Sequence, residues 1–158
     1  AGIAQNAPIT EMTDEQWDKM IKVHLYGNFY NCREAAKRML KRNKGKIVNI
    51  SSDLGSLGCE EYAHYSAAKG GINAFTKSLA RELAPHINVN AVAPGATFTD
   101  ILAEFGDNYV EEESAKYPLK RLAQPEEIAK SVLFLASSCA DFYTGQILGP
   151  NGGGVMNG

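Results

Sequence analysis

Apolar positions recur every three to four residues in three long segments of the chain, and this spacing predicts three helices. The first begins after Thr13, whose side chain can start a capping box, and continues to about Lys41 with Gly27 as a weak point. The second covers about residues 62–84. The third covers residues 125–137, with a proline in its first turn.

Short runs rich in β-branched residues separate these helices and predict three strands. They cover residues 46–52, 88–93 and 146–148. Strands separated by helices of this length form a parallel sheet that is covered on both faces through right-handed crossovers. The pattern therefore predicts an α/β fold, in which ligands bind beyond the carboxyl ends of the strands.

Two segments show no regular spacing of apolar residues. Residues 1–10 are expected to form a loop, because glycine and proline interrupt them. Residues 97–122 are long and polar, which is typical of a lid, and residues 101–105 are the best candidate for a helix within them.

Composition and charge limit the classes of partner that the chain is expected to bind. The chain has 158 residues, is 44% hydrophobic and carries a formal charge of −2, which fits one soluble globular domain and gives no reason to expect nucleic acid or an anionic membrane. Cys32, Cys59 and Cys139 form no CxxC or Cys/His cluster, so neither a disulfide framework nor a metal site is expected. No apolar stretch reaches the length of a membrane span, so we expect a cytoplasmic protein with a small-molecule partner.

Tyr65 and Lys69 carry the strongest chemical signal. Residues four apart project from the same face of a helix, so the ammonium group can lie beside the phenol, although an exposed tyrosine with a solvated lysine gives the same spacing. A nearby cation favours the phenolate, and lowering a phenol pKa by about three units needs roughly 4 kcal/mol. We therefore predict that Lys69 lowers the pKa of Tyr65, which then exchanges a proton with a substrate oxygen.

A hydroxyl group at the end of the first predicted strand completes this arrangement. Ser52 precedes Tyr65 by 13 residues and can hold the oxygen that Tyr65 protonates. Because side chains alternate along a strand, only one of Ser51 and Ser52 is expected to face the site. We favour Ser52 because of its spacing to the tyrosine.

The order of these motifs resembles the short-chain dehydrogenase/reductases, especially the 3-oxoacyl carrier-protein reductases. The matching segments are Ile50-Ser-Ser52, Tyr65-Ser-Ala-Ala-Lys69, Asn88-Val-Asn-Ala-Val-Ala-Pro-Gly95, Thr97-x-Thr99, Pro118 to Glu127, Thr144-Gly-Gln146 and Asn151-Gly-Gly153. The resemblance covers almost the whole chain.

The resemblance implies roles for individual residues. Tyr65 is similar to the catalytic acid/base, Ser52 to the residue that positions the substrate oxygen, and Lys69 to the residue that tunes the tyrosine and holds the nicotinamide ribose. A second set is similar to the segment that contacts the nicotinamide carboxamide and the pyrophosphate, namely Pro94, Gly95, Thr97 and Thr99. The implied cofactor is NAD or NADP.

The sequence departs from the family pattern at two places. His24 stands where the family usually has a fourth catalytic residue, an asparagine, and it could bind a relay water for Lys69 or be an ordinary core histidine. The glycine-rich turn that cradles the pyrophosphate is not found before Ala1. Residues 1–158 are therefore expected to form a single partial domain, the C-terminal half of a doubly wound, Rossmann-type parallel sheet with flanking helices.

The resemblance implies NAD(P)-dependent hydride transfer between a secondary alcohol and a ketone, in a homodimer or homotetramer. Two alternatives stay open at this point: a non-catalytic fragment that associates with another chain, and a dehydratase or epimerase of the same fold. An apolar sheet edge and helix faces that lack their covering half would favour association.

Overall fold

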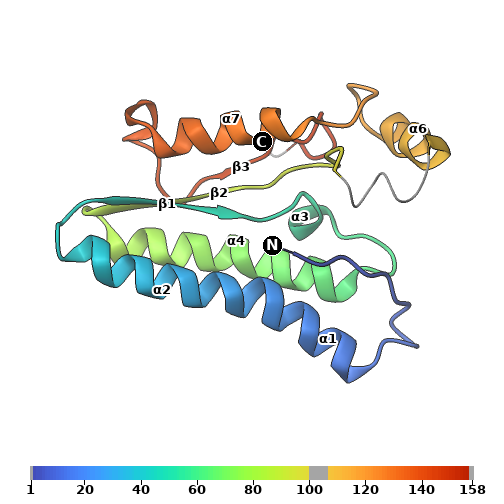
Figure 1. Cartoon of the computed structure of the whole chain (residues 1–158), viewed down its shortest axis with the longest axis horizontal. Coiled ribbons are helices and arrows are strands. Elements are labelled where there is room, and N and C mark those ends of the chain that lie inside the picture. The colour runs from blue at the N-terminus through green and yellow to red at the C-terminus, as the bar shows by residue number, and fades with distance from the viewer. Residues whose placement is uncertain (1, 100–106, 157–158) are drawn as a thin grey trace.

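A three-layer α/β arrangement is seen in a computed structural model, which describes residues 2–99 and 107–156 (Figure 1). The described strands are β1 (Gly45–Ile50), β2 (Ile87–Val92) and β3 (Ile147–Leu148), and they form a parallel sheet in the order β1-β2-β3. The register pairs Gly45 with Ile87 and Ile50 with Val92. This confirms the predicted parallel sheet.

Helices from the first half of the chain cover one face of the sheet (Figure 1). They are α1 (Asp14–Ile21), the π-helical segment η1 (Lys22–Tyr26), α2 (Gly27–Leu40) and α4 (Ala63–Leu83). The first three run on without a break, as the sequence predicts, and the capping box at Thr13 is present. The weak point at Gly27 corresponds to the end of the π-helical turn.

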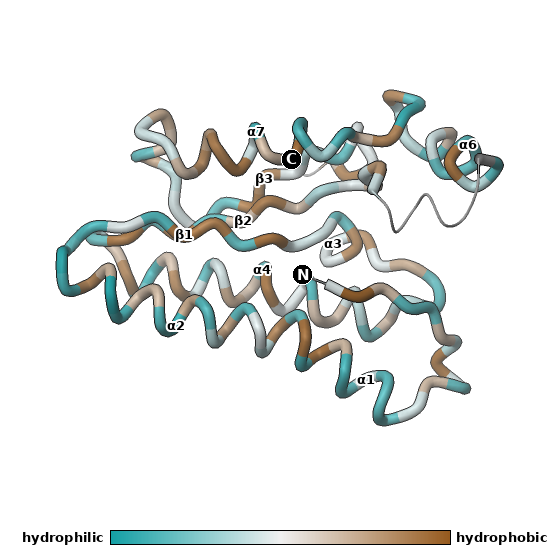
Figure 2. Tube along the Cα trace, in the orientation of Figure 1, coloured by the Kyte–Doolittle hydropathy of each residue, from teal (hydrophilic) through white to brown (hydrophobic). Residues whose placement is uncertain are grey.

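The other face is covered by α7 (Pro125–Ala136), followed by the short 3-10 helix η2 (Ser138–Ala140). Figure 2 shows apolar residues concentrated along the strands and polar residues on the outward turns of α1 and α2. Alternation along the strands divides the core in two: Ile47 and Val89 pack toward α2 and α4, whereas Val48 and Val92 pack toward α7.

The segments that follow the carboxyl ends of β1 and β2 differ from the prediction. The first strand ends at Ile50, two residues before the predicted end at residue 52, and a one-turn helix that the sequence did not predict, α3 (Leu54–Leu57), follows it. The predicted lid contains α6 (Asp107–Lys116). The helix predicted at residues 101–105 lies outside the described residues.

Membrane insertion by a helix finds no support in the structure. Among the described residues, no helix combines the length and the apolar character that crossing a bilayer requires.

Candidate active site

The candidate catalytic side chains meet at the carboxyl end of β1. Ser52 follows this strand, Tyr65 and Lys69 lie on α4, and His24 lies on η1. Ser52, His24 and Lys69 are buried. The fold therefore brings together the four side chains that the sequence singled out.

Lys69 is held inside the fold by a backbone carbonyl. Its Nζ donates a hydrogen bond to the carbonyl oxygen of Ile50 at 3.1 Å and lies over the Tyr65 ring, 5.6 Å from its centroid. Only 7% of the residue is exposed, and this burial lowers the pKa of Lys69 to about 8. The ammonium group is therefore a readier proton donor than an ordinary lysine.

The pKa of Tyr65 departs from the sequence-based expectation. Burial raises the pKa of Tyr65, a hydrogen bond from Ser52 acts in the opposite direction, and the nearby Asp53 carboxylate raises the pKa further. The pKa of Tyr65 is therefore raised where we expected it to be lowered, and Lys69 is not among the groups that shift it. The reason is that desolvation of the phenol outweighs the stabilisation of its anion.

The two serines at the end of β1 have separate partners. Ser51 Oγ donates to the backbone carbonyl of Lys69 at 3.0 Å, which fixes β1 against α4. Ser52 Oγ donates a hydrogen bond to Asp53 Oδ1 at 3.0 Å, and the Ser52 hydroxyl also lies close enough to Tyr65 to counteract the rise in its pKa. The structure thus places Ser52, the serine that we favoured, next to the phenol.

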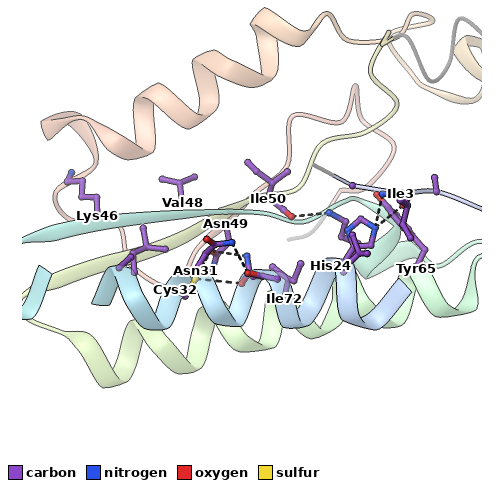
Figure 3. A pocket seen from close by; sticks show the side chains of 18 of the residues that line it. Ile3, His24, Asn31, Cys32, Lys46, Val48, Asn49, Ile50, Tyr65 and Ile72 are labelled. Atoms are coloured by element: carbon purple, nitrogen blue, oxygen red, sulfur yellow. Dashed lines mark hydrogen bonds between the residues drawn. The ribbon is translucent and has the colours of Figure 1, made fainter. Parts of the chain in front are cut away.

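His24 contacts both the amino-terminal segment and the tyrosine (Figure 3). Its Nε2 lies 2.8 Å from the carbonyl oxygen of Ile3 and 3.4 Å from the Ile3 amide nitrogen, so both backbone groups of Ile3 face the imidazole. The imidazole meets the Tyr65 ring edge to face at 5.2 Å. Burial lowers the pKa of His24, and the charge of Lys69 lowers it further. His24 is therefore neutral at pH 7 and buttresses the phenol ring.

The residues expected to bind cofactor fall into two groups. Thr99 lines a groove of about 960 Å³ that also contains Tyr65, Lys69 and His24. Pro94, Gly95 and Thr97 form the turn after β2; the Pro94 carbonyl accepts from Asp53 N at 3.0 Å, and Thr97 Oγ1 donates to the Gly95 carbonyl at 3.0 Å.

Two polar residues beside Ser52 were not predicted from the sequence. Asp53 is 5% exposed and accepts hydrogen bonds from the Leu54 amide and from Ser52. The Tyr117 hydroxyl lies 3.5 Å from Asp53 Oδ2 and accepts a hydrogen bond from the Ala96 amide at 3.1 Å. An acidic residue directly after the two serines was the available signal for Asp53, whereas Tyr117 lies in a segment without clear periodicity.

Known proteins resemble this chain over nearly its full length. Residues 1–154 match the family model described as enoyl-(acyl carrier protein) reductase. The chain is 41% identical to the 3-oxoacyl-[acyl-carrier-protein] reductase FabG of Aquifex aeolicus over 154 residues, which cover 97% of this chain and 62% of that relative. The FabG of Chlamydia trachomatis gives the same identity and the same shares over 155 residues.

A solved structure agrees with these sequence matches. The crystal structure titled short-chain dehydrogenase/reductase SDR:glucose/ribitol dehydrogenase, from Brucella melitensis, superimposes with a TM-score of 0.89 at 40% identity and covers 99% of this chain and 63% of that one. The chain thus spans less than two thirds of the length of these relatives. Because the match combines the family model, the sequence and the fold, the chain belongs to the short-chain dehydrogenase/reductase family.

Proposed function

We propose that this chain carries the catalytic residues of an NAD(P)-dependent oxidoreductase that transfers hydride between a secondary alcohol and a ketone. The observation that carries the proposal is the meeting of Ser52, Tyr65 and Lys69 at one strand end, with the Ser52 hydroxyl close enough to act on the pKa of Tyr65 and the Lys69 ammonium over the Tyr65 ring. The names of the most similar relatives support a carbonyl or alcohol substrate.

Tyr65 is the proton donor in ketone reduction. Its raised pKa keeps the phenol protonated at neutral pH, so the hydroxyl is ready to give its proton to a carbonyl oxygen as negative charge develops there. Ser52 holds that oxygen beside the phenol. Lys69, with a pKa of about 8, is the nearby group that can restore the proton, and His24 keeps the tyrosine ring in place.

The bound nicotinamide supplies or accepts the hydride. The residues that would hold its ribose and carboxamide end are Tyr65, Lys69, Pro94, Gly95, Thr97 and Thr99. The fit is favourable at Lys69, because its ammonium has three donors and one is directed to Ile50, which leaves hydrogens for ribose hydroxyls. Either NAD or NADP is compatible with this end of the cofactor.

We extend the proposal to assembly and location. An aromatic face at the junction of η1 and α2 is open to solvent, with Tyr30 50% exposed and Tyr26 47% exposed. Such a patch favours burial against another subunit, so we propose a homodimer or homotetramer acting on a small alcohol or carbonyl compound in the cytoplasm. The same face supports the alternative of a fragment that only associates with another chain.

The test is Tyr65→Phe in a form of the protein that binds dinucleotide. We expect ketone reduction to fall by about 10²- to 10⁴-fold, because the acid that protonates the carbonyl oxygen is lost. Tyr62→Phe is the matched control, since Tyr62 packs against the Tyr65 ring at 6.3 Å and has no role in the proposed proton transfer. Turnover is measured by nicotinamide absorbance and folding by circular dichroism.

Retained activity in Tyr65→Phe with an unchanged fold would show that the proton comes from another group. Dinucleotide titration by calorimetry then separates enzyme from fragment. A protein that binds no dinucleotide and turns over no carbonyl compound would support the association alternative.

A further inference from the structure

The hydroxyl group of Ser52 has more neighbours than one hydrogen can serve. The Leu54 amide lies 3.2 Å from Ser52 Oγ as a donor, Ser52 Oγ donates to Asp53 Oδ1 at 3.0 Å, and the hydroxyl is also close enough to Tyr65 to act on its pKa. An amide N–H can only donate, and the Leu54 amide shares its hydrogen between Asp53 Oδ1 at 2.8 Å and Ser52 Oγ at 3.2 Å, so one lone pair of Ser52 faces this amide. The single hydroxyl hydrogen is left to be shared between Asp53 and the substrate side.

The protonation state of Asp53 decides this sharing. An ionised carboxylate is an acceptor only, so it takes the Ser52 hydrogen and leaves a lone pair of Ser52 to face the substrate. A protonated Asp53 can donate to Ser52, which frees the Ser52 hydrogen for a carbonyl oxygen. A ketone oxygen needs a donor, whereas an alcohol hydroxyl also needs an acceptor.

Groups from several elements face Asp53 and affect its ionisation. Tyr117 donates to Oδ2 from the segment after α6, and the negative charge of Glu113 on α6 disfavours the anion. Tyr65 on α4 and Cys59 in the loop after α3 are close enough to sense its charge. Burial outweighs the hydrogen bonds and raises the pKa of Asp53. The neutral carboxyl is therefore more accessible than in an exposed aspartate.

We propose that Asp53 is a positioning residue that sets the direction of the Ser52 hydroxyl: ionised Asp53 prepares Ser52 to accept from an alcohol, and protonated Asp53 prepares it to donate to a ketone. This inference rests on the proposed function, because it deepens the role of Ser52 at that site. It links the protonation state of Asp53 to whether Ser52 is prepared for the alcohol or for the ketone.

The first experiment reads the contact between Asp53 and Ser52 without any turnover. The carboxyl carbon of Asp53 is followed by NMR during a pH titration of the ¹³C-aspartate-labelled protein, and its signal is assigned by its loss in Asp53→Asn. Removing the donor in Ser52→Ala should shift the Asp53 titration midpoint upward. Ser51→Ala is the matched control, since Ser51 Oγ donates to Lys69 and should leave the midpoint unchanged.

The second experiment reads the effect on ketone reduction. In the unmodified enzyme, kcat/KM for reduction should fall by up to about tenfold per pH unit above the Asp53 midpoint. Asp53→Asn keeps an oxygen to cap the Leu54 amide but does not titrate, so this limb of the pH profile should disappear. In a Ser52→Ala background, Asp53→Asn should have no further effect on the profile.

Each experiment can overturn the inference. An Asp53 midpoint that is the same with and without the Ser52 hydroxyl would exclude the shared hydrogen, whether or not the protein is an oxidoreductase. An acid-dependent limb that persists in Asp53→Asn would assign the titration to another group. A protein that reduces no carbonyl compound would refute the proposed function, and the NMR titration would still decide the contact.

Discussion

Lys69 is an ammonium group buried where a single backbone carbonyl is its hydrogen-bond partner in the described part of the chain. The desolvation that lowers its pKa from 10.5 to about 8 costs folding free energy whenever the lysine is charged. Between these two values the unfolded chain binds more protons at this residue than the folded chain does. By linkage, the contribution of Lys69 to stability must rise as the pH rises from about 8 toward 10.5.

We predict that Lys69→Met removes this dependence. From pH 8 to pH 9.5 the unmodified protein should gain about 1 kcal/mol of unfolding free energy per pH unit relative to the variant. Urea unfolding at several pH values measures the difference. Lys77→Met is the matched control, because Lys77 is exposed on the same helix and Lys69 is kept, so this variant should gain stability with pH as the unmodified protein does. Parallel pH curves for the Lys69 variant and the unmodified protein would contradict the prediction.

The residues of the site differ in how far sequence could reveal them. Tyr65 and Lys69 were predictable as neighbours, because a spacing of four fixes two side chains on one helical face whatever surrounds them. The pKa direction of Tyr65 was not, since it depends on burial by His24 and Tyr62, which come from other turns and elements. Asp53 was equally hidden, because its effect on Ser52 depends on a side-chain contact.

At the scale of elements, the spacing of apolar residues revealed the long helices but not the short ones. The helices at 14–40 and 63–83 repeat their apolar face over several turns, so their pattern is unambiguous. The one-turn helix α3 is too short to show a period, and it forms because Asp53 caps the Leu54 amide. The π-helical turn between α1 and α2 is also too short to show a period of its own, and it places His24 beside Tyr65.

Two glycines of these elements should respond in opposite ways to an added methyl group. A Cβ at Gly95, in the turn after β2, would lie 2.9 Å from the Asn151 Cα, so backbone must shift and we expect Gly95→Ala to destabilise the protein by about 1–3 kcal/mol. At Gly27 the nearest atom is 3.9 Å away in a helix, so Gly27→Ala should stabilise by about 0.5–1 kcal/mol. Thermal unfolding of both variants checks the pair; equal shifts would show that the contact at Asn151 relaxes freely.

At the scale of the whole molecule, the sheet carries a separate apolar cluster on each face, and the polar site lies at one end of the strands. The core toward α2 and α4 is built from Cys32, Ile47, Ile87 and other small or branched residues, whereas Leu135 anchors the opposite side. Sequence patterning predicts this two-faced arrangement, because each strand alternates between the layers. The stability of the whole molecule depends on pH because titratable polar side chains are buried within this apolar packing.

His64 is the clearest of these groups. The residue is 0% exposed, and within the described residues neither ring nitrogen has a hydrogen-bond partner. Burial lowers the pKa of His64, and that of His24 as well, so the folded chain resists the protons that the unfolded chain accepts below pH 6.5. Their contribution to stability is therefore complete above about pH 6.5 and is lost as the pH falls.

We predict that His64→Leu weakens this acid sensitivity and stabilises the fold at pH 7.5 by about 1–3 kcal/mol, because an unsatisfied polar group leaves the core. The control is His86→Gln, at an exposed histidine in the turn between α4 and β2, and it should keep the acid sensitivity that His64 confers. Urea unfolding at pH 7.5 and pH 5.5 compares the three proteins. If His64→Leu loses as much stability on acidification as the unmodified chain, then His64 does not hold a neutral, buried imidazole, and the acid sensitivity must be traced to His24 beside Tyr65.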